Sequence, residues 1–220
     1  ILSGLVGSEM CIRDRSILII TKARDNHLVL LTRELSIWLM NYKKQGSKRG
    51  LVVYVDEQLR HSKRFDAAGI ERDNPHFFLP TRDDTSKSRH QCLDSDEGQL
   101  RFWTSNMCSS SPSLFDLVIT LGGDGTVLLA SWLFQSSVPP VIPFSLGSLG
   151  FLTPFRFEDY ESIMRSALSN GVRLSVRMRF RATVYRAIDH VNPELGAKRR
   201  RALQSDNAET MLHNICLLYT

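Results

Sequence analysis

Short, uninterrupted apolar runs recur along the chain and alternate with longer segments of mixed polarity. The runs lie at residues 16–21, 51–55, 117–121 and 141–146. Strands that are buried on both faces of a parallel sheet have this continuous apolar pattern, whereas half-exposed strands alternate apolar and polar residues. The four runs therefore predict the strands of a parallel sheet.

Three of the intervening segments predict helices. Residues 127–135 form a second, shorter apolar run that is typical of a buried helix, and residues 158–169 predict a helix that ends at Asn170-Gly171. The longest helix is predicted to be ended by Gly46 and Gly50. Its apolar face consists of Leu28, Leu31, Leu35, Trp38 and Leu39. A strand, a helix and a second strand in this order favour a right-handed crossover.

Two regions depart from this pattern. Residues 60–113 are rich in charge and serine and are predicted to be mostly a long surface insertion, apart from a possible regular piece at 100–103. Residues 173–186 alternate apolar side chains with arginine and threonine, which is typical of a strand with one solvent-exposed face. The predicted class is α/β: a Rossmann-like parallel-sheet domain over 16–170, followed by the start of a β-rich, β-sandwich-like domain over 171–213.

Bulk composition limits the classes of function. Hydrophobic residues make up 42% of the 220 residues, and no apolar stretch has the length of a membrane span, about 18 residues. The net charge of +5 suits anionic ligands such as nucleotides. It is modest for a nucleic-acid-binding protein, and no helix or repeat concentrates it. We therefore expect a soluble protein that binds neither membrane nor nucleic acid.

Cysteine usage and the chain ends give further expectations. The four cysteines form no C-x-x-C pair and the histidines form no H-E-x-x-H motif, which indicates neither a zinc site nor a disulfide framework. A reducing, intracellular compartment fits this usage. Residues 1–15 and 214–220 do not resemble the start or end of a folded domain, and we expect both to be extraneous sequence.

The motif GGDGT at residues 122–126 is the main candidate for chemistry. An Asp-Gly pair between apolar runs is also a hairpin signal, but the fully apolar segment after it favours a strand, a glycine turn and a helix that Thr126 would cap. Backbone N–H groups at such a helix start bind anions, and glycines admit a phosphate closely. A carboxylate would repel that phosphate, so Asp124 is a candidate general base for a hydroxyl, or alternatively a ligand of Mg²⁺.

A second motif makes the resemblance specific. LGGDGTV at residues 121–127, followed by VPPVIPFSLGSLGFLTPF at 138–155, resembles the NAD kinase family in its eukaryotic, fungal-like form. The similarity extends to ITKARDN at 20–26 and RMRFRATVYR at 177–186. GGDGT is shared with lipid kinases, but the G-T-G-N-D type segment expected of those enzymes is absent from the sequence.

The resemblance implies an enzyme that transfers the γ-phosphoryl group of ATP to the 2′-hydroxyl of the adenosine ribose of NAD, giving NADP. It implies ATP with Mg²⁺ or another divalent cation, a cytoplasmic location with a mitochondrial one left open, and a homo-oligomer. Asp124 would be the catalytic base, and no residue is assigned as a metal ligand. The residues that would contact phosphate, nucleotide or NAD are Gly122, Gly123, Gly125, Thr126, Gly150, Phe151 and Leu152.

Several alternatives remain open on the sequence. Phe151 could instead be a core aromatic, and the arginines at 177, 179 and 181 form either a solvated face or a phosphate clamp. Residues 198–201, KRRR, are read as a solvated loop rather than a nuclear signal. The Asn-Glu motif expected later in the family is not present after Asn214, so we expect a fragment that is inactive by itself. The competing functions are a lipid kinase and a non-catalytic nucleotide-binding module.

Overall fold

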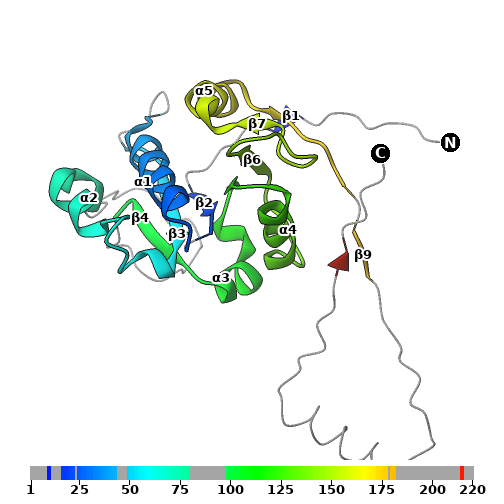
Figure 1. Ribbon diagram of the computed structural model, residues 1–220, viewed down its shortest axis with the longest axis horizontal. Coiled ribbons are helices and arrows are strands. Elements are labelled where there is room, and N and C mark those ends of the chain that lie inside the picture. The colour runs from blue at the N-terminus through cyan, green and yellow to red at the C-terminus, as the bar shows by residue number, and fades with distance from the viewer. Residues whose placement is uncertain are drawn as a thin grey trace, which may run out of the picture. The chain divides into compact units, whose positions relative to one another are not determined.

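A parallel sheet with helices on both faces forms the body of the protein (Figure 1). The computed structural model describes residues 9–10, 16–22, 24–43, 49–79, 98–177, 179–181 and 214–215. By its internal contacts the chain divides into two units, Ile1–Ser175 and Val176–Thr220. The sheet and its helices belong to the first unit. None of the helices in the described ranges is long and apolar enough to cross a membrane.

The six-stranded sheet is built outward from its centre, in the order β4-β3-β2-β5-β6-β7. Every neighbouring pair is parallel. The strands are β2 (Ser16–Ile20), β3 (Val52–Asp56), β4 (Leu100–Trp103), β5 (Leu117–Leu121), β6 (Val141–Ser145) and β7 (Phe155–Arg156). The four predicted strands are β2, β3, β5 and β6, which confirms the Rossmann-like parallel sheet.

Each face of the sheet carries its own core. On one face Ile17 and Ile19 pack with residues of α1 and α5, and on the other Leu18 and Ile20 pack with residues of α3 and α4. The alternation within β2 shows why this strand has to be apolar throughout. The helices are α1 (Asn26–Asn41), α2 (Ala67–Asp73), α3 (Ser105–Ser110), α4 (Asp124–Leu133) and α5 (Tyr160–Asn170).

Local signals explain where the two helices on the first face begin and end. Asp25 caps α1, because its carboxylate accepts hydrogen bonds from the N–H groups of His27 at 3.0 Å and Leu28 at 3.3 Å. The helix ends at Asn41, earlier than the predicted glycine stop. Gly171 follows α5 with φ of 80°, a left-handed conformation that glycine adopts without strain. The predicted end of this helix is therefore confirmed.

The prediction of a surface insertion over residues 60–113 is wrong for the parts that the structure describes. Phe65, Ile70 and Phe77 are fully buried in the core. The possible regular piece expected at 100–103 is the strand β4, which extends the sheet beside β3. Gln99 is also buried, and its Nε2 donates to the carbonyl oxygens of Met40 and Leu51. Short 3-10 helices lie at η1 (Glu57–Leu59), η2 (Pro75–Phe78), η3 (Pro112–Leu114) and η4 (Phe157–Asp159).

The helix α4 is less buried than its apolar sequence predicts. Thr126, Ala130 and Leu133 face the sheet, whereas Leu128 and Trp132 are each 45% exposed. The interpretation as a buried helix is therefore wrong for its outer side. A helix packed on one face of a sheet buries a single stripe of residues, and the rest of this apolar run lies outside that stripe.

Two short strand pairs lie outside the main sheet. β1 (Glu9–Met10) pairs with β8 (Val172–Arg173), and β9 (Phe180–Arg181) pairs with β10 (Asn214–Ile215), both antiparallel. The predicted strand over 173–186 is not continuous, because residues 174–177 have no regular structure. Residues 182–213, including the KRRR run, lie outside the described residues. The β-rich second domain and its boundaries therefore stay a prediction, as does the interpretation of the two chain ends.

Candidate active site

The GGDGT motif lies where the strand order of the sheet reverses. From β2 the chain proceeds outward through β3 and β4, then returns to place β5 on the other side of β2. Turns at the carboxyl ends of β2 and β5 therefore leave in opposite directions, and such a crevice is where open α/β sheets bind ligands. The turn after β5 contains Gly122 and Gly123, and α4 begins at Asp124.

Gly122 makes the sharp exit from the sheet. Its φ of 146° is a conformation that side chains rarely adopt, and its N–H donates to the Phe144 carbonyl of β6 at 3.0 Å. A Cβ at Gly122 would lie 2.5 Å from Thr126 Oγ1. The segment is thus a strand, a turn and a helix, and the hairpin interpretation is wrong.

Thr126 does not cap the helix as predicted. Gly123 occupies the N-cap position, and Thr126 lies within α4, where its N–H donates to the Gly123 carbonyl at 2.9 Å. The Thr126 side chain is 3% exposed, and its hydroxyl has no hydrogen-bond partner among the described residues. The Thr126 side chain faces Gly122 rather than the solvent. Its buried position therefore does not support the predicted contact with phosphate.

Gly123 and Gly125 are the open part of the turn. Both are exposed, and an added Cβ at either position would meet no atom within 4 Å. An open backbone at the N-terminus of a helix leaves its N–H groups accessible to an anion. These two glycines therefore fit the predicted phosphate cradle, whereas Gly122 serves the geometry of the turn.

Asp124 is held by a loop that is distant in sequence. Its Oδ2 accepts a hydrogen bond from the Phe151 N–H at 3.0 Å. Its Oδ1 accepts from the Leu152 N–H at 2.9 Å and from the Thr153 hydroxyl at 3.3 Å. The two motifs recognised in the sequence, GGDGT and LGFLT, are thus joined through one carboxylate.

These donors set the ionisation of Asp124. The hydrogen bond from the Leu152 N–H is the largest effect and holds the pKa of Asp124 below the ordinary value for a carboxyl group. Partial desolvation opposes the shift, and the Phe151 N–H and both donors of Thr153 reinforce it. The side chain is therefore a carboxylate at neutral pH, available as an acceptor.

The loop that supplies these donors is anchored at both ends. It joins β6 to β7, and these strands pair through Phe144 with Phe155 and Ser145 with Arg156. The Ser145 hydroxyl also donates to the Phe155 carbonyl at 3.0 Å. The loop is therefore closed at its base, next to the carboxyl end of β5, and projects toward the start of α4.

The three predicted site residues of this loop take different positions. Phe151 is 56% exposed, so the alternative interpretation as a core aromatic is wrong. Leu152 is buried and contributes its N–H group rather than its side chain. Gly150 is crowded, because a Cβ there would lie 2.2 Å from Asp124 Oδ1. Glycine at this position thus admits the carboxylate itself.

Comparison with known proteins decides the family. The ATP-NAD kinase N-terminal domain family matches residues 17–172. The chain belongs to the NAD kinase family. It is 38% identical to the NAD(+) kinase of Saccharomyces cerevisiae over 184 residues, which is 83% of this chain and 30% of that protein. It is 32% identical to the ATP-NADH kinase YEF1 of the same yeast, over 90% of this chain and 35% of that protein.

A solved structure is also similar. The crystal structure of yeast NADH kinase complexed with NADH matches 76% of this chain and 41% of that chain, with a TM-score of 0.48 and 24% identity. The chain spans about a third of the length of the yeast NAD(+) kinase and the ATP-NADH kinase. The family match covers the sheet, the GGDGT turn and the LGFLT loop.

Sequence reasoning assigns no individual role to three residues near the carboxyl edge of the sheet, Thr153, Lys22 and Arg24. Thr153 belongs to the LGFLT motif but has no predicted role, yet it is fully buried against Asp124. A threonine is the ordinary β-branched residue of any core, so nothing in the pattern singled it out. Lys22 and Arg24 lie in the turn after β2 and are exposed beside the switch point. Both residues belong to the ITKARDN segment at 20–26, which resembles the NAD kinase family without indicating a role for either side chain.

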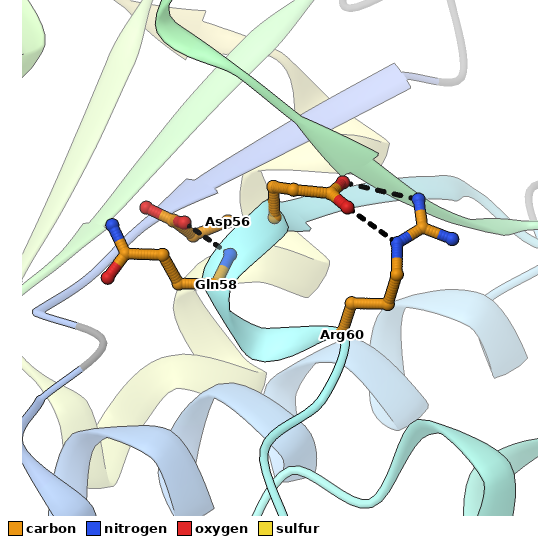
Figure 2. Close-up of polar contacts among 4 residues, drawn as sticks. Asp56, Gln58 and Arg60 are labelled. Carbon is orange, nitrogen blue, oxygen red and sulfur yellow. Dashed lines mark hydrogen bonds and ion pairs between the residues drawn. The ribbon is translucent and has the colours of Figure 1, made fainter.

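Another carboxylate lies along the same edge of the sheet but has a local role. Asp56 ends β3, and its Oδ1 accepts from the Gln58 N–H at 2.8 Å, which caps η1 (Figure 2). Arg60 pairs with Glu57 at 2.7 Å in the same turn. The strand β2 separates β3 from β5, so Asp56 lies at the same edge of the sheet as Asp124 but away from the GGDGT turn. Asp56 can therefore serve as a control for Asp124.

The described residues offer no preformed metal cage. No group of three or more His, Cys, Asp or Glu side chains among them lies close enough to hold a metal ion. Mg²⁺ in phosphoryl-transfer sites commonly uses one or two carboxylates together with substrate phosphates and water. One accessible carboxylate next to a phosphate cradle is compatible with that mode of binding.

Proposed function

We propose that the whole protein transfers the γ-phosphoryl group of ATP to the 2′-hydroxyl of the adenosine ribose of NAD, with Asp124 as the catalytic base. Family membership and the names of both yeast relatives support this reaction. The observation that carries the proposal is the position of Asp124, a partly exposed carboxylate at a helix start beside the open Gly123. A carboxylate acceptor next to an anion-binding turn suits phosphoryl transfer to a hydroxyl.

A weakly basic carboxylate is compatible with this role. The transition state of phosphoryl transfer is loose in most analyses, so positioning of the hydroxyl matters more than early removal of its proton. The lowered pKa of Asp124 keeps the group ionised and able to accept a hydrogen bond from the substrate throughout the neutral range. Phe151, exposed on the adjacent loop, would contact the NAD.

Positive charge is needed to bind the donor beside a carboxylate. Lys22 and Arg24, exposed after β2, would offset the charge of the ATP phosphates, with Gly123 and Gly125 supplying backbone N–H groups. Mg²⁺ would be carried by those phosphates and would neutralise charge as the group is transferred. Asp124 Oδ2 would be the protein atom nearest to the acceptor hydroxyl.

The remaining properties of the whole protein are also proposals. The family resemblance supports a homo-oligomer in the cytoplasm, acting on nucleotides and on neither nucleic acid nor membranes. The yeast relatives are named for NAD(+) and for NADH, and both acceptors are to be compared. Residues 16–170 would form the α/β domain, and a β-rich domain beginning at 171 would complete the NAD site.

The test is the substitution Asp124→Asn in the full-length protein. If Asp124 is the base, the rate of NADP formation from NAD and ATP falls by about 10² to 10⁴, while the Kd for nucleotide changes far less. Asn places an NH₂ group where Oδ2 faces the Phe151 N–H, so the amide NMR signals of Phe151 and Leu152 are recorded alongside to separate loop movement from lost catalysis.

Asp56→Asn is the matched control, because Asn also caps helices and the same charge is removed from the same edge of the sheet. It is expected to retain wild-type activity. An unchanged rate in Asp124→Asn would exclude Asp124 as the catalytic base. A wild-type protein that binds nucleotide but forms no NADP would instead be a non-catalytic nucleotide-binding module. Phosphorylation of diacylglycerol but not of NAD by the wild-type protein would instead establish a lipid kinase, the alternative that the family match does not favour.

A further inference from the structure

We propose that Thr153 is a positioning residue: its buried hydroxyl fixes Oδ1 of Asp124 and thereby reserves Oδ2 for the acceptor hydroxyl. This inference rests on the proposed function for the identity of that hydroxyl. The arrangement of Thr153, Gly150 and Asp124 stands independently of the reaction.

The direction of the hydrogen bonds follows from the chemistry of the groups. Thr153 Oγ1 accepts from the Gly150 N–H at 3.0 Å, because an amide nitrogen can only donate. The hydroxyl proton is then directed at Asp124 Oδ1, 3.3 Å away, because an ionised carboxylate can only accept. Thr153 is fully buried, so water does not compete for this proton. The hydroxyl therefore connects the loop backbone to the carboxylate in one defined direction.

The two oxygens of Asp124 are consequently unequal. A carboxylate oxygen accepts about two hydrogen bonds. Oδ1 already accepts two, from the Leu152 N–H and the Thr153 hydroxyl. Oδ2 accepts one hydrogen bond of this geometry among the described residues, from the Phe151 N–H, and has an acceptor position left. The Thr153 N–H also lowers the pKa of Asp124, but it is not among the three groups whose hydrogen bonds to the two oxygens are defined by distance and angle. A substrate hydroxyl would therefore be bound at Oδ2.

Steric contacts keep the carboxylate from exchanging its oxygens. The position of a Cβ on Gly150 is 2.2 Å from Asp124 Oδ1, 2.5 Å from Thr153 Oγ1 and 2.8 Å from Asp124 Cγ. The backbone of Gly150 is thus packed against the carboxylate on the side of Oδ1. Rotation of the carboxylate would break the bonds at Oδ1 and bring it against this backbone.

In the proposed reaction, Oδ2 accepts the proton of the ribose hydroxyl while Oδ1 stays bound to the loop. As the ribose oxygen forms its bond to the γ-phosphorus, the bond from that phosphorus to the bridging oxygen breaks and ADP leaves with the electron pair. The O–H bond of the ribose hydroxyl breaks, and its proton moves to Asp124 Oδ2. The bonds at Oδ1 hold the carboxylate in place during this transfer.

The test compares Thr153→Val with Thr153→Ser in the full-length protein. Valine has the shape of threonine without the hydroxyl, and serine keeps the hydroxyl. We expect Thr153→Val to lower kcat for NAD phosphorylation about tenfold, as for a lost hydrogen bond to a charged group, with KM for NAD changed less than about threefold. Thr153→Ser is expected to stay within about threefold of the wild-type kcat.

A second measurement does not depend on the reaction. The Asp124 carboxyl carbon is titrated by ¹³C NMR, and its pKa is expected to rise in Thr153→Val because a donor to the ionised form is lost, and to return toward the wild-type value in Thr153→Ser. An unchanged titration in Thr153→Val, or equal loss of kcat in both variants, would overturn the inference. If the wild-type protein does not phosphorylate NAD while the titration shifts as expected, the proposed function fails and the link between Thr153 and Asp124 stands.

Discussion

The Gly150 backbone and the Asp124 carboxylate are in such close contact that a side chain at position 150 would have to displace the carboxylate. A Cβ at this position would overlap both Oδ1 and Cγ of Asp124. A glycine that appears in a nucleotide-binding motif is usually explained by the approach of a phosphate. Here the atom that needs the space belongs to the protein's own candidate base.

Substitution of this glycine is expected to impair the reaction through Asp124. Gly150→Ala forces the carboxylate away from the loop, and a misplacement of about 1 Å can cost about 10²-fold in rate. We expect a loss of kcat of about 10 to 100-fold in the full-length protein, measured with NAD and ATP.

The structural control is Gly123→Ala, which adds the same methyl group where no protein atom lies within 4 Å. It serves for the position of the loop and not for kcat, because Gly123 belongs to the proposed phosphate cradle. The amide NMR signals of Phe151 and Leu152 should shift in Gly150→Ala and remain in place in Gly123→Ala. Wild-type signals in Gly150→Ala would show that the loop accommodates the methyl group and that crowding has no functional role.

The contact between Asp124 and the loop is expected to resist acid down to low pH. Because the pKa of Asp124 is lowered on folding, the contact contributes stability that is fully present above the unfolded value, about 4. That contribution is lost as the pH falls through the lowered pKa. The amide signals of Phe151 and Leu152 should therefore be constant from pH 8 to pH 5 and move only below about pH 4. A transition centred between pH 5 and pH 7 would contradict the assignment of the shift.

Phe151 is expected to contribute to binding and not to folding. An exposed side chain can be removed with a change of roughly 0.5 kcal/mol or less in the free energy of unfolding. Stacking of an aromatic ring on a base contributes about 1–3 kcal/mol. Phe151→Ala should thus raise KM for NAD by about 5 to 150-fold at nearly unchanged Tm. Leu149→Ala, which truncates another exposed apolar side chain of the loop, should change neither.

The sheet could be predicted from the sequence because its central strands are buried on both faces. An apolar run such as Leu117–Leu121 is unfavourable in a solvent-exposed loop, so its pattern predicts a buried strand. The outer strand β4 is predicted only as a possible regular piece because LRFW is short and partly exposed, and the preceding helix α2, which has only seven residues, is not predicted at all. Burial of these pieces depends on the sheet edge that they cover, which periodicity does not reveal.

The candidate site could be predicted as a set of motifs but not as a geometry. The roles of Asp124 and of the open glycines follow from residue type and from the resemblance. The contact of Asp124 with Thr153 spans 29 positions and exists only because β6 and β7 close the loop beside β5. The sequence favours Thr126 as the cap because hydroxyl residues are common at that position. The helix begins earlier, at Asp124, whose negative charge suits the first turn.

The turn at Gly122 has a consequence for the thermodynamics of ligand binding. Its positive φ, its bond to the Phe144 carbonyl and the Thr126 hydroxyl that fills its side-chain space are all internal to the protein. The turn is therefore already ordered before any nucleotide arrives. Less conformational entropy is lost on association with a preformed turn than with one that the ligand has to fold.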